Sequence, residues 1–233
     1  PGLGSHGLWN DETILAAVAE LPLPALLSRV KEDVHPPLSL ILSWAVRQAV
    51  GPARWTEAVV RGLPAALGLL AVWLAFRVGT RLLSPPAGLL AAVLLAINPM
   101  HVHYSREARN YSLLVALALA ALAAAARQRE RPDVRAGVLT GGACVGLLYT
   151  HNLAVLLVAA VFAALAAAPP DMLLEPRRLR ALAAAGLTVV LGYLPWLSTL
   201  IRQAAELAPG GVLLMTSFCR KKRGLLTISP AML

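Results

Sequence analysis

Charged side chains are scarce in this sequence. They make up 14% of its 233 residues, whereas hydrophobic residues make up 58%, and the mean hydropathy is +0.68. A soluble globular domain of this length needs much more polar surface than such a composition supplies. The scarcity of charge therefore argues against an ordinary soluble domain and predicts a protein of the membrane.

Aromatic residues are also few, at 5% of the chain. No stretch alternates between apolar and polar residues with the period of two that a membrane β-barrel requires. Alanine and leucine dominate the apolar runs instead, and small side chains are typical of contacts between transmembrane helices. The predicted fold class is all-α, a polytopic bundle of transmembrane helices.

Cysteine occurs twice, as Cys144 in an apolar run and Cys219 in a basic tail. This placement fits neither a metal-ligand spacing nor a disulfide framework. The net charge is +9, but the arginines separate apolar runs and do not form a patch. The charge therefore indicates membrane topology, and nucleic acid is not expected as a partner.

The N-terminal part of the chain is polar. No charged and then apolar leader precedes the segment around Trp9, so we expect a signal or a first membrane helix to be missing. Residues 1–36 are too charged to cross hydrocarbon and are expected to form an extramembrane segment with one or two short helices. The apolar run 37–50 is shorter than the roughly 20 residues of a span and contains Arg47, which predicts an interfacial or re-entrant helix.

Longer apolar runs follow, each able to cross a bilayer, some with tilt. They cover approximately residues 61–80, 86–103, 111–127, 136–151, 152–169 and 181–200. We therefore expect three regions: an extracytoplasmic loop with juxtamembrane helices over 1–50, a transmembrane core of about six spans over 51–203, and an atypical tail over 204–233. The tail has no clear structural pattern and fits a fragment end or a misread coding frame.

The turns between these runs are of two kinds. One kind is basic and contains Arg77 and Arg81, then Arg127, Arg129, Arg131 and Arg135, then Arg177, Arg178 and Arg180. The other kind holds residues suited to chemistry, at 101–111 and 149–152. The two kinds alternate strictly, so each should lie on its own side of the membrane. The positive-inside rule makes the basic side cytoplasmic. The segment with Asp11, Glu12 and His35 joins the outer face if 37–50 does not cross.

Asp11 and Glu12 follow Trp9 at the rim of the apolar region. Carboxylates there can sit in water and face a lipid headgroup, although a helix N-cap with an acidic first turn is the simpler explanation of this motif taken alone. His35 precedes two prolines, which stiffen the chain and could orient the imidazole relative to the bilayer surface. The alternative is that the prolines only mark the start of a helix. These two motifs are ambiguous when each is taken alone.

The block 105–111, SREARNY, places three charges between two apolar runs. Ionisable residues near membrane helices are functional candidates, although Glu107 with Arg106 or Arg109 also fits a structural ion pair. Tyr149 and His151 end the fourth run, where an interfacial aromatic belt is the alternative.

All four motifs fall on one face, and together they hold a carboxylate that can accept a proton from a hydroxyl and cations that can stabilise a phosphate. This combination suits group transfer from an anionic leaving group.

The same residues, in collinear order, resemble the dolichyl-phosphate-mannose-type, or family 39-like, glycosyltransferases of the GT-C fold. The motifs are W-x-D-E at 9–12, H-P-P-L at 35–38, R-x-L-P at 61–64, N-P-x-H-x-x-Y-S-R-E-A-R-x-Y at 98–111 and Y-T-H at 149–151. The resemblance covers about residues 8 to 203, and the block ending in S-R-E-A-R-x-Y is its most specific part.

The resemblance implies an inverting transferase of the cell membrane that takes a sugar from a polyprenyl-phosphate carrier. The acceptor would be a protein, a lipid or a cell-wall glycan on the extracytoplasmic side. Membrane lipid and the lipid-linked donor are the implied partners. No cofactor beyond the donor is implied with certainty, no metal-binding residues are assigned, and a requirement for a divalent metal is left open.

The resemblance also implies roles for particular residues. Asp11 would be the general base, with Glu12 beside it for orientation. The carrier phosphate would be held by His35, Arg109 and Arg106. Glu107 would orient an arginine, and the donor cavity would be lined by Tyr111, Tyr149 and His151.

Members of this family begin with a membrane helix before the Asp-Glu loop and continue well beyond residue 203. We therefore expect a chain truncated at both ends. Two other functions remain as alternatives. A transporter or lipid-linked sugar flippase would carry its charges nearer mid-membrane on broken helices, and a structural membrane subunit would need no charged motifs on one face.

Overall fold

The computed structural model describes residues 2–4, 6–31, 35–167 and 174–207. All regular secondary structure in these residues is helical, which confirms the all-α prediction. The helices are α1 (Asn10–Val18), α2 (Leu23–Lys31), α3 (Leu38–Val50), the 3₁₀ turn η1 (Pro52–Arg54), α4 (Glu57–Leu82), α5 (Pro85–Ile97), α6 (Pro99–Tyr104), α7 (Tyr111–Glu130), α8 (Val134–Leu148), α9 (Ala154–Ala166) and α11 (Pro176–Leu207).

The chain divides into two compact units, Pro1–Tyr193 and Leu194–Leu233. In the second unit α11 continues as a helix to Leu207 and contains Pro195. Most of the tail expected to be atypical lies outside the described residues. The account that follows concerns the first unit.

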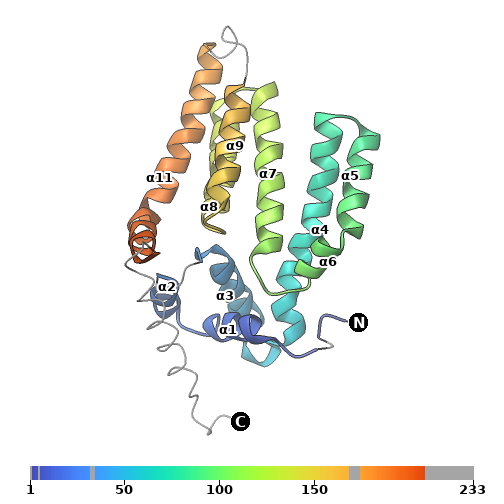
Figure 1. Cartoon of the computed structure of the whole chain (residues 1–233), viewed down its shortest axis with the longest axis vertical. Helices are drawn as coiled ribbons and strands as arrows, with labels where there is room; N and C mark the ends of the chain where they lie inside the picture. The colour runs from blue at the N-terminus through green and yellow to red at the C-terminus, as the bar shows by residue number, and fades with distance from the viewer. Residues whose placement is uncertain (1, 5, 32–34, 168–173, 208–233) are drawn as a thin grey trace. The chain divides into compact units, whose positions relative to one another are not determined.

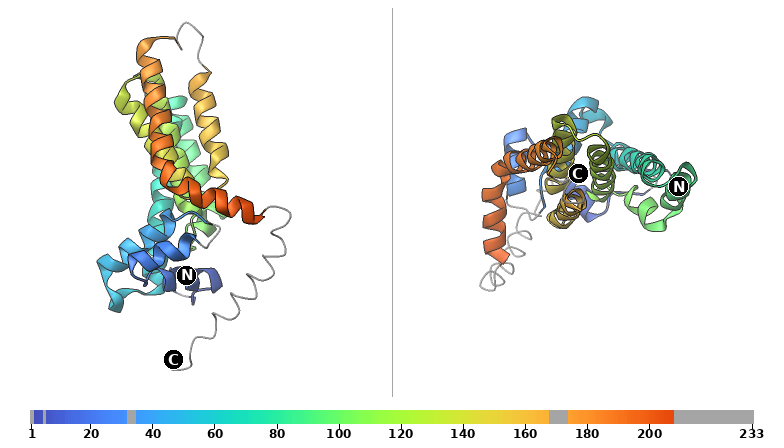
Figure 2. Two further views of the ribbon diagram at one scale, coloured as in Figure 1. Left: turned by 90° about the vertical axis from the view of Figure 1, so that its left-hand side faces the viewer. Right: turned by 90° about the horizontal axis from the view of Figure 1, so that it is seen from above.

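In the first unit the long helices run side by side, and the short helices gather at one end of them (Figure 1). The bundle consists of α4, α5, α7, α8, α9 and the first part of α11, and Figure 2 shows the same arrangement from two further directions. The end that carries α1, α2, α3 and α6 is called here the motif end. It holds the turns at 105–110 and 149–153.

The segment 37–50 does not cross the bundle. At the start of α3 the Leu38 N–H donates to the carbonyl oxygen of Tyr149, at 2.9 Å. At its other end α3 leads through η1 into the start of α4, where Arg61 contacts Glu12 of α1. Both ends of α3 therefore lie at the motif end. The position of this helix relative to the membrane stays a prediction.

The basic turns lie together at the opposite end. Arg81 at the end of α4 donates two hydrogen bonds to Glu130 at the end of α7, at 2.8 and 2.6 Å. Arg129 of α7 donates to the carbonyl oxygen of Ala164 near the end of α9, at 2.5 Å. These basic turns therefore lie at the end of the bundle away from the motif-bearing turns. The side of the membrane that each end faces stays a prediction.

The expected run 86–103 is wrong as one continuous helix. It breaks between α5 and α6, where Asn98 has an extended backbone and its side chain accepts hydrogen bonds from the N–H groups of Met100 and His101, at 2.9 and 3.1 Å. The break has a local cause, because a residue that precedes proline is disfavoured in the helical conformation. Asn98 instead caps a short helix that begins at Pro99.

Within the described residues, three helices are long and apolar enough to cross a membrane: Glu57–Leu82, Tyr111–Glu130 and Pro176–Gln203. The helices α3, α5, α8 and α9 are apolar but shorter, at 13 to 15 residues. Large apolar side chains also face outward from the bundle, including Leu69 at 75% and Leu191 at 59% exposed. These apolar helices and outward-facing side chains indicate a membrane protein.

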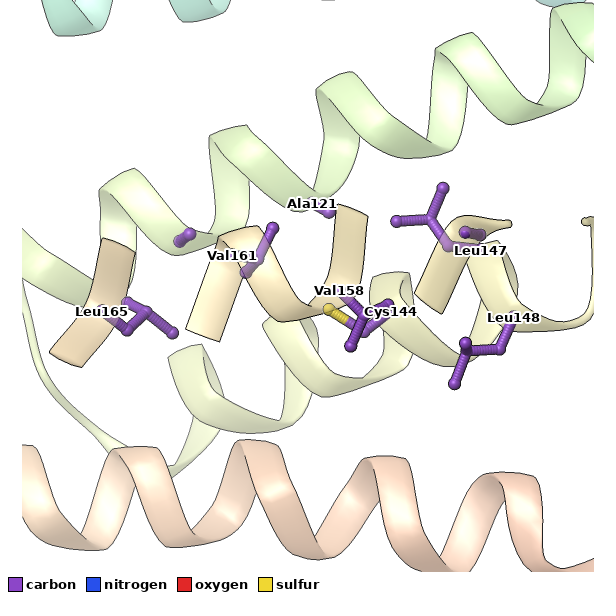
Figure 3. Close-up of a cluster of buried hydrophobic side chains, with 9 residues drawn as sticks. Ala121, Cys144, Leu147, Leu148, Val158, Val161 and Leu165 are labelled. Carbon is purple, nitrogen blue, oxygen red and sulfur yellow. The ribbon is translucent and has the colours of Figure 1, made fainter. Parts of the chain in front are cut away.

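The core of the bundle lies between α7, α8 and α9 (Figure 3). Its buried members are Ala121, Ala125, Cys144, Leu147, Leu148, Ala154, Val158, Val161 and Leu165. Small residues set the spacing of the neighbouring helices. A Cβ atom on Gly141 of α8 would lie only 2.6 Å from the carbonyl oxygen of Ala185 in α11. Close backbone approach at small residues is how transmembrane helices pack.

Candidate active site

The first turn of α1 carries both acidic residues of the first motif. Trp9 is the N-cap residue, and Asp11 and Glu12 follow within one turn. Negative charge there is stabilised by the helix dipole, and Glu12 accepts a hydrogen bond from the Trp9 N–H at 3.4 Å. The simpler interpretation, an acidic first helical turn, is therefore correct as a description of local structure. The two side chains nevertheless differ sharply in their surroundings.

Glu12 is completely buried. Its carboxylate accepts hydrogen bonds from Nε and Nη2 of Arg61, at 3.0 and 2.6 Å, and from the Ala108 N–H, at 2.9 Å. Burial alone would raise the pKa of Glu12, but the bonds from Arg61 and Ala108 outweigh it, so the pKa lies below its ordinary value. Glu12 is therefore held as an anion.

Arg61, near the start of α4, also binds the N-terminal segment. Its Nη1 donates to the carbonyl oxygens of Leu3 and His6, both at 2.8 Å, and its Nη2 donates to that of Gly7 at 3.0 Å. With the two bonds to Glu12, all five donors of the guanidinium group are used. We call Glu12, Arg61 and the Ala108 N–H the Glu12 clamp.

Asp11 lies outside the clamp and is accessible. Its side chain is 42% exposed and forms an ion pair with Arg109. The Arg109 guanidinium also lies over the rings of Trp9 and Tyr111, 5.7 and 5.6 Å from their centroids. Cation–π contacts of this kind favour one orientation of the planar group. A carboxylate and an oriented guanidinium thus meet at the surface of the motif end.

The H-P-P-L motif at 35–38 and the Y-T-H motif at 149–151 lie next to each other, and both lie close to the S-R-E-A-R-x-Y block. The Leu38 N–H binds the carbonyl oxygen of Tyr149, and the Asn110 side-chain amide binds that of Thr150, both at 2.9 Å. His35 lies close enough to His151 to affect it electrostatically. The Y-T-H turn therefore connects the H-P-P-L motif to the end of the S-R-E-A-R-x-Y block.

His151 is held in its neutral form. Burial lowers its pKa, and His35 lowers it further. The Leu153 N–H donates to its Nδ1 at 3.1 Å, which makes Nδ1 an acceptor and leaves the proton on Nε2. The ring therefore presents Nε2–H as a hydrogen-bond donor.

The remaining predicted residues are placed less centrally. The Glu107 carboxylate lies 3.1 Å from Nε2 of His103 in α6, and Arg109, one of its two expected partners, pairs with Asp11 instead. Arg106 is exposed. The Tyr149 hydroxyl donates to the carbonyl oxygen of Gly192 at 3.1 Å, which ties the turn to α11.

The structure brings the predicted residues together in two groups. One unites Asp11, Glu12, Arg109 and Tyr111, and the other unites His35, Tyr149 and His151, with Asn110 connecting the two. Arg61 and Asn110 were given no role by the sequence. A signal for Arg61 existed, because an arginine four residues into a long apolar helix is costly unless it is paired.

A small pocket opens beside Arg109. It is mostly apolar and lies among α1, α3, α4 and α7, lined by Leu15, Ser39, Leu42, Ser43, Leu63, Pro64, Leu67, Ala108, Arg109 and Leu113. In the part of the chain that the structure describes, no group of three or more His, Cys, Asp or Glu side chains is placed to hold a metal ion.

A comparison with known protein families identifies the same family that the motifs resemble. Residues 34–196, more than half of the chain, match the family model described as dolichyl-phosphate-mannose-protein mannosyltransferase. No curated protein and no solved structure matches the chain. The matched range includes the H-P-P-L, R-x-L-P, S-R-E-A-R-x-Y and Y-T-H motifs, which carry the resemblance seen in the sequence. The chain therefore belongs to the dolichyl-phosphate-mannose-protein mannosyltransferase family, whose members are membrane glycosyltransferases of the GT-C type.

Proposed function

We propose that this protein transfers a sugar from a polyprenyl-phosphate donor to a hydroxyl group of an acceptor, with Asp11 as the general base. The acceptor is a protein, a lipid or a cell-wall glycan at the extracytoplasmic face of the cell membrane. The observation that carries the proposal is the contact between Asp11 and Arg109. In this contact a carboxylate, which can accept a proton, lies next to a cation suited to phosphate. The chain's membership of a membrane glycosyltransferase family supports the proposal.

In the proposed reaction the acceptor hydroxyl gives its proton to the Asp11 carboxylate. The hydroxyl oxygen forms a bond to the anomeric carbon of the sugar, and the bond from that carbon to the phosphate oxygen breaks. The bonding electron pair leaves with the polyprenyl phosphate, which gains negative charge. Donors aimed at this developing charge accelerate the step.

Arg109 is the main phosphate ligand in this proposal, because its planar group matches two phosphate oxygens. His151 supplies a neutral donor through Nε2–H, and His35 and the exposed Arg106 add further contacts. Tyr111 and Tyr149 line the donor site.

The proposed sidedness depends on the arginines. The turns at the ends of α4 and α7, and the start of α11, carry most of the arginines of the core. Positively charged turns remain cytoplasmic, so the motif end faces outward. Reporter fusions after Arg81, Arg131 and Arg180, compared with Tyr104 and Tyr149, test this assignment, and all five on one side would contradict it.

The decisive experiment is Asp11→Asn in the full-length protein, assayed in membranes with polyprenyl-phosphate-linked hexoses as labelled donors. We expect transfer to fall at least about 10²-fold, because general-base catalysis contributes that much, with membrane insertion unchanged. Glu20→Gln, which removes an exposed carboxylate just after α1, is the matched control. Normal turnover by D11N would exclude Asp11 as the base, and flux of the lipid-linked sugar without glycosyl product would favour a flippase.

A further inference from the structure

We infer that Arg61 is a positioning residue of the active site. Through Glu12 and the Ala108 N–H it holds Asp11 and Arg109 in register without touching the substrate. This inference rests on the proposed function for its catalytic part, but its structural part can be tested without any glycosyl transfer.

The first argument is access. The side chain of Glu12 is 0% exposed and that of Arg61 is 10% exposed, whereas the side chains of Asp11 and Arg109 are 42% and 23% exposed. All five donors of the Arg61 guanidinium are already bonded within the protein. Arg61 has no donor left for a phosphate, so its role in the reaction has to pass through other residues.

The second argument is connectivity. Glu12 follows Asp11 in α1, and Ala108 precedes Arg109 in the turn before α7. Oε1 of Glu12 accepts from both Arg61 Nε and the Ala108 N–H, so one carboxylate joins the backbone beside the base to the backbone beside the phosphate ligand. The clamp therefore sets the distance between Asp11 and Arg109.

The third argument is the identity of the residue. A buried charged pair is stable only when the geometry is good and the remaining donors are satisfied, and both conditions hold here. Lysine would keep the charge, but its single ammonium group cannot span Glu12 and three separate carbonyl oxygens. The fork of an arginine is needed to join the N-terminal segment, α1 and α4 at one point.

The expected catalytic effect is on turnover. Misplacement of a reacting group by about 1 Å lowers rates by about 10²-fold. We expect R61Q and E12Q each to lower kcat by roughly that factor. The donor KM should change less, because Arg61 and Glu12 do not touch the donor in this proposal.

The structural test is amide hydrogen exchange on the full-length protein in lipid nanodiscs, for R61Q, E12Q and the double variant. We expect faster exchange in residues 2–12 and 105–112, with the core of α7 and α8 unchanged. The double variant should resemble either single one, because the two side chains act as one unit. R77Q is the matched control on α4, since Arg77 lies over Trp73 away from the clamp.

The catalytic test is the same set of variants in the transfer assay, with rates normalised to inserted protein. R61Q should lower the rate of the D11N variant by a smaller factor than it lowers the wild-type rate, because part of the effect of Arg61 passes through Asp11. A residue that served folding alone would lower the amount of inserted protein and leave kcat unchanged. If R61Q does not insert, the nearly isosteric E12Q takes its place in both tests.

Unchanged exchange at 105–112 in both R61Q and E12Q would overturn the inference, and so would normal kcat in both. If the wild-type protein transfers no sugar, the proposed function fails, while the exchange experiment still decides whether the clamp joins these segments.

Discussion

The side-chain amide of Asn110 donates a hydrogen bond to the backbone carbonyl oxygen of Thr150 at 2.9 Å, and 40 positions separate the two residues in sequence. Both residues are buried. The neighbouring carbonyl oxygen, that of Tyr149, accepts from the Leu38 N–H. Part of the Y-T-H motif therefore joins two other motifs through its backbone.

Asn110→Asp should destabilise the protein more than Asn110→Ala. The alanine variant leaves one buried carbonyl oxygen without its donor, at a cost of about 1–3 kcal/mol. The aspartate variant adds a buried carboxylate next to that carbonyl oxygen. An ionised carboxylate has no proton to donate, so two acceptors face each other. Thermal unfolding in detergent measures the order, and a more stable N110D than N110A would contradict the observed bond.

Arg109→Lys should weaken donor binding even though the charge is kept. Lysine lacks the planar fork that matches phosphate oxygens and stacks on Trp9 and Tyr111. We expect the donor KM to rise by about tenfold, equivalent to about 1.4 kcal/mol, and to rise further in R109Q. Steady-state transfer at varied donor concentration measures this, with R54Q in the exposed turn η1 as control. An unchanged KM in both variants would remove Arg109 from the phosphate site.

Gly141→Ala should destabilise the bundle, whereas Gly142→Ala should not. A Cβ at 141 meets the Ala185 carbonyl oxygen at 2.6 Å, and a Cβ at 142 meets nothing within 4 Å. Overpacking costs about 1–3 kcal/mol, while alanine in an open helical position stabilises by up to about 1 kcal/mol. The adjacent positions form a matched pair, and equal melting temperatures would argue against close packing of α8 on α11.

His151 should make stability depend on pH near neutrality. Its pKa in the folded protein lies below the ordinary 6.5, so the unfolded chain binds the proton more readily. Its contribution is therefore full above about pH 6.5 and is lost as the pH falls through the lower folded pKa. We expect the melting temperature to fall between about pH 7 and pH 5, and this part of the slope to vanish in H151N. Identical slopes would show that His151 is not held neutral.

Much of the architecture could be predicted from local pattern. Apolar runs separated by arginines give the helices of the bundle, because hydrophobic length and the placement of charge are local properties. Hydropathy alone does not reveal the break within 86–103, because Met100 and Val102 continue the apolar composition while the helix ends before Asn98-Pro99. The order of motifs also identified the family.

The pairing of side chains could not be predicted in the same way. Asp11 and Glu12 are adjacent carboxylates in one helical turn, and nothing local tells which is buried. The Glu107 carboxylate lies 3.1 Å from Nε2 of His103, a neighbour that the sequence did not indicate. Ion pairs between residues distant in sequence depend on how the helices pack against one another, and the hydrophobic periodicity of the sequence does not predict that packing.

The sequence by itself determined the all-helical membrane fold and the family to which the chain belongs, because hydropathy, charge and residue order act along the chain. Only the tertiary structure decided that Glu12 is enclosed by Arg61 while Asp11 stays accessible beside Arg109. The reason is physical: burial and hydrogen-bond geometry depend on which helices meet, and here α1, α4 and the turn before α7 meet at one carboxylate.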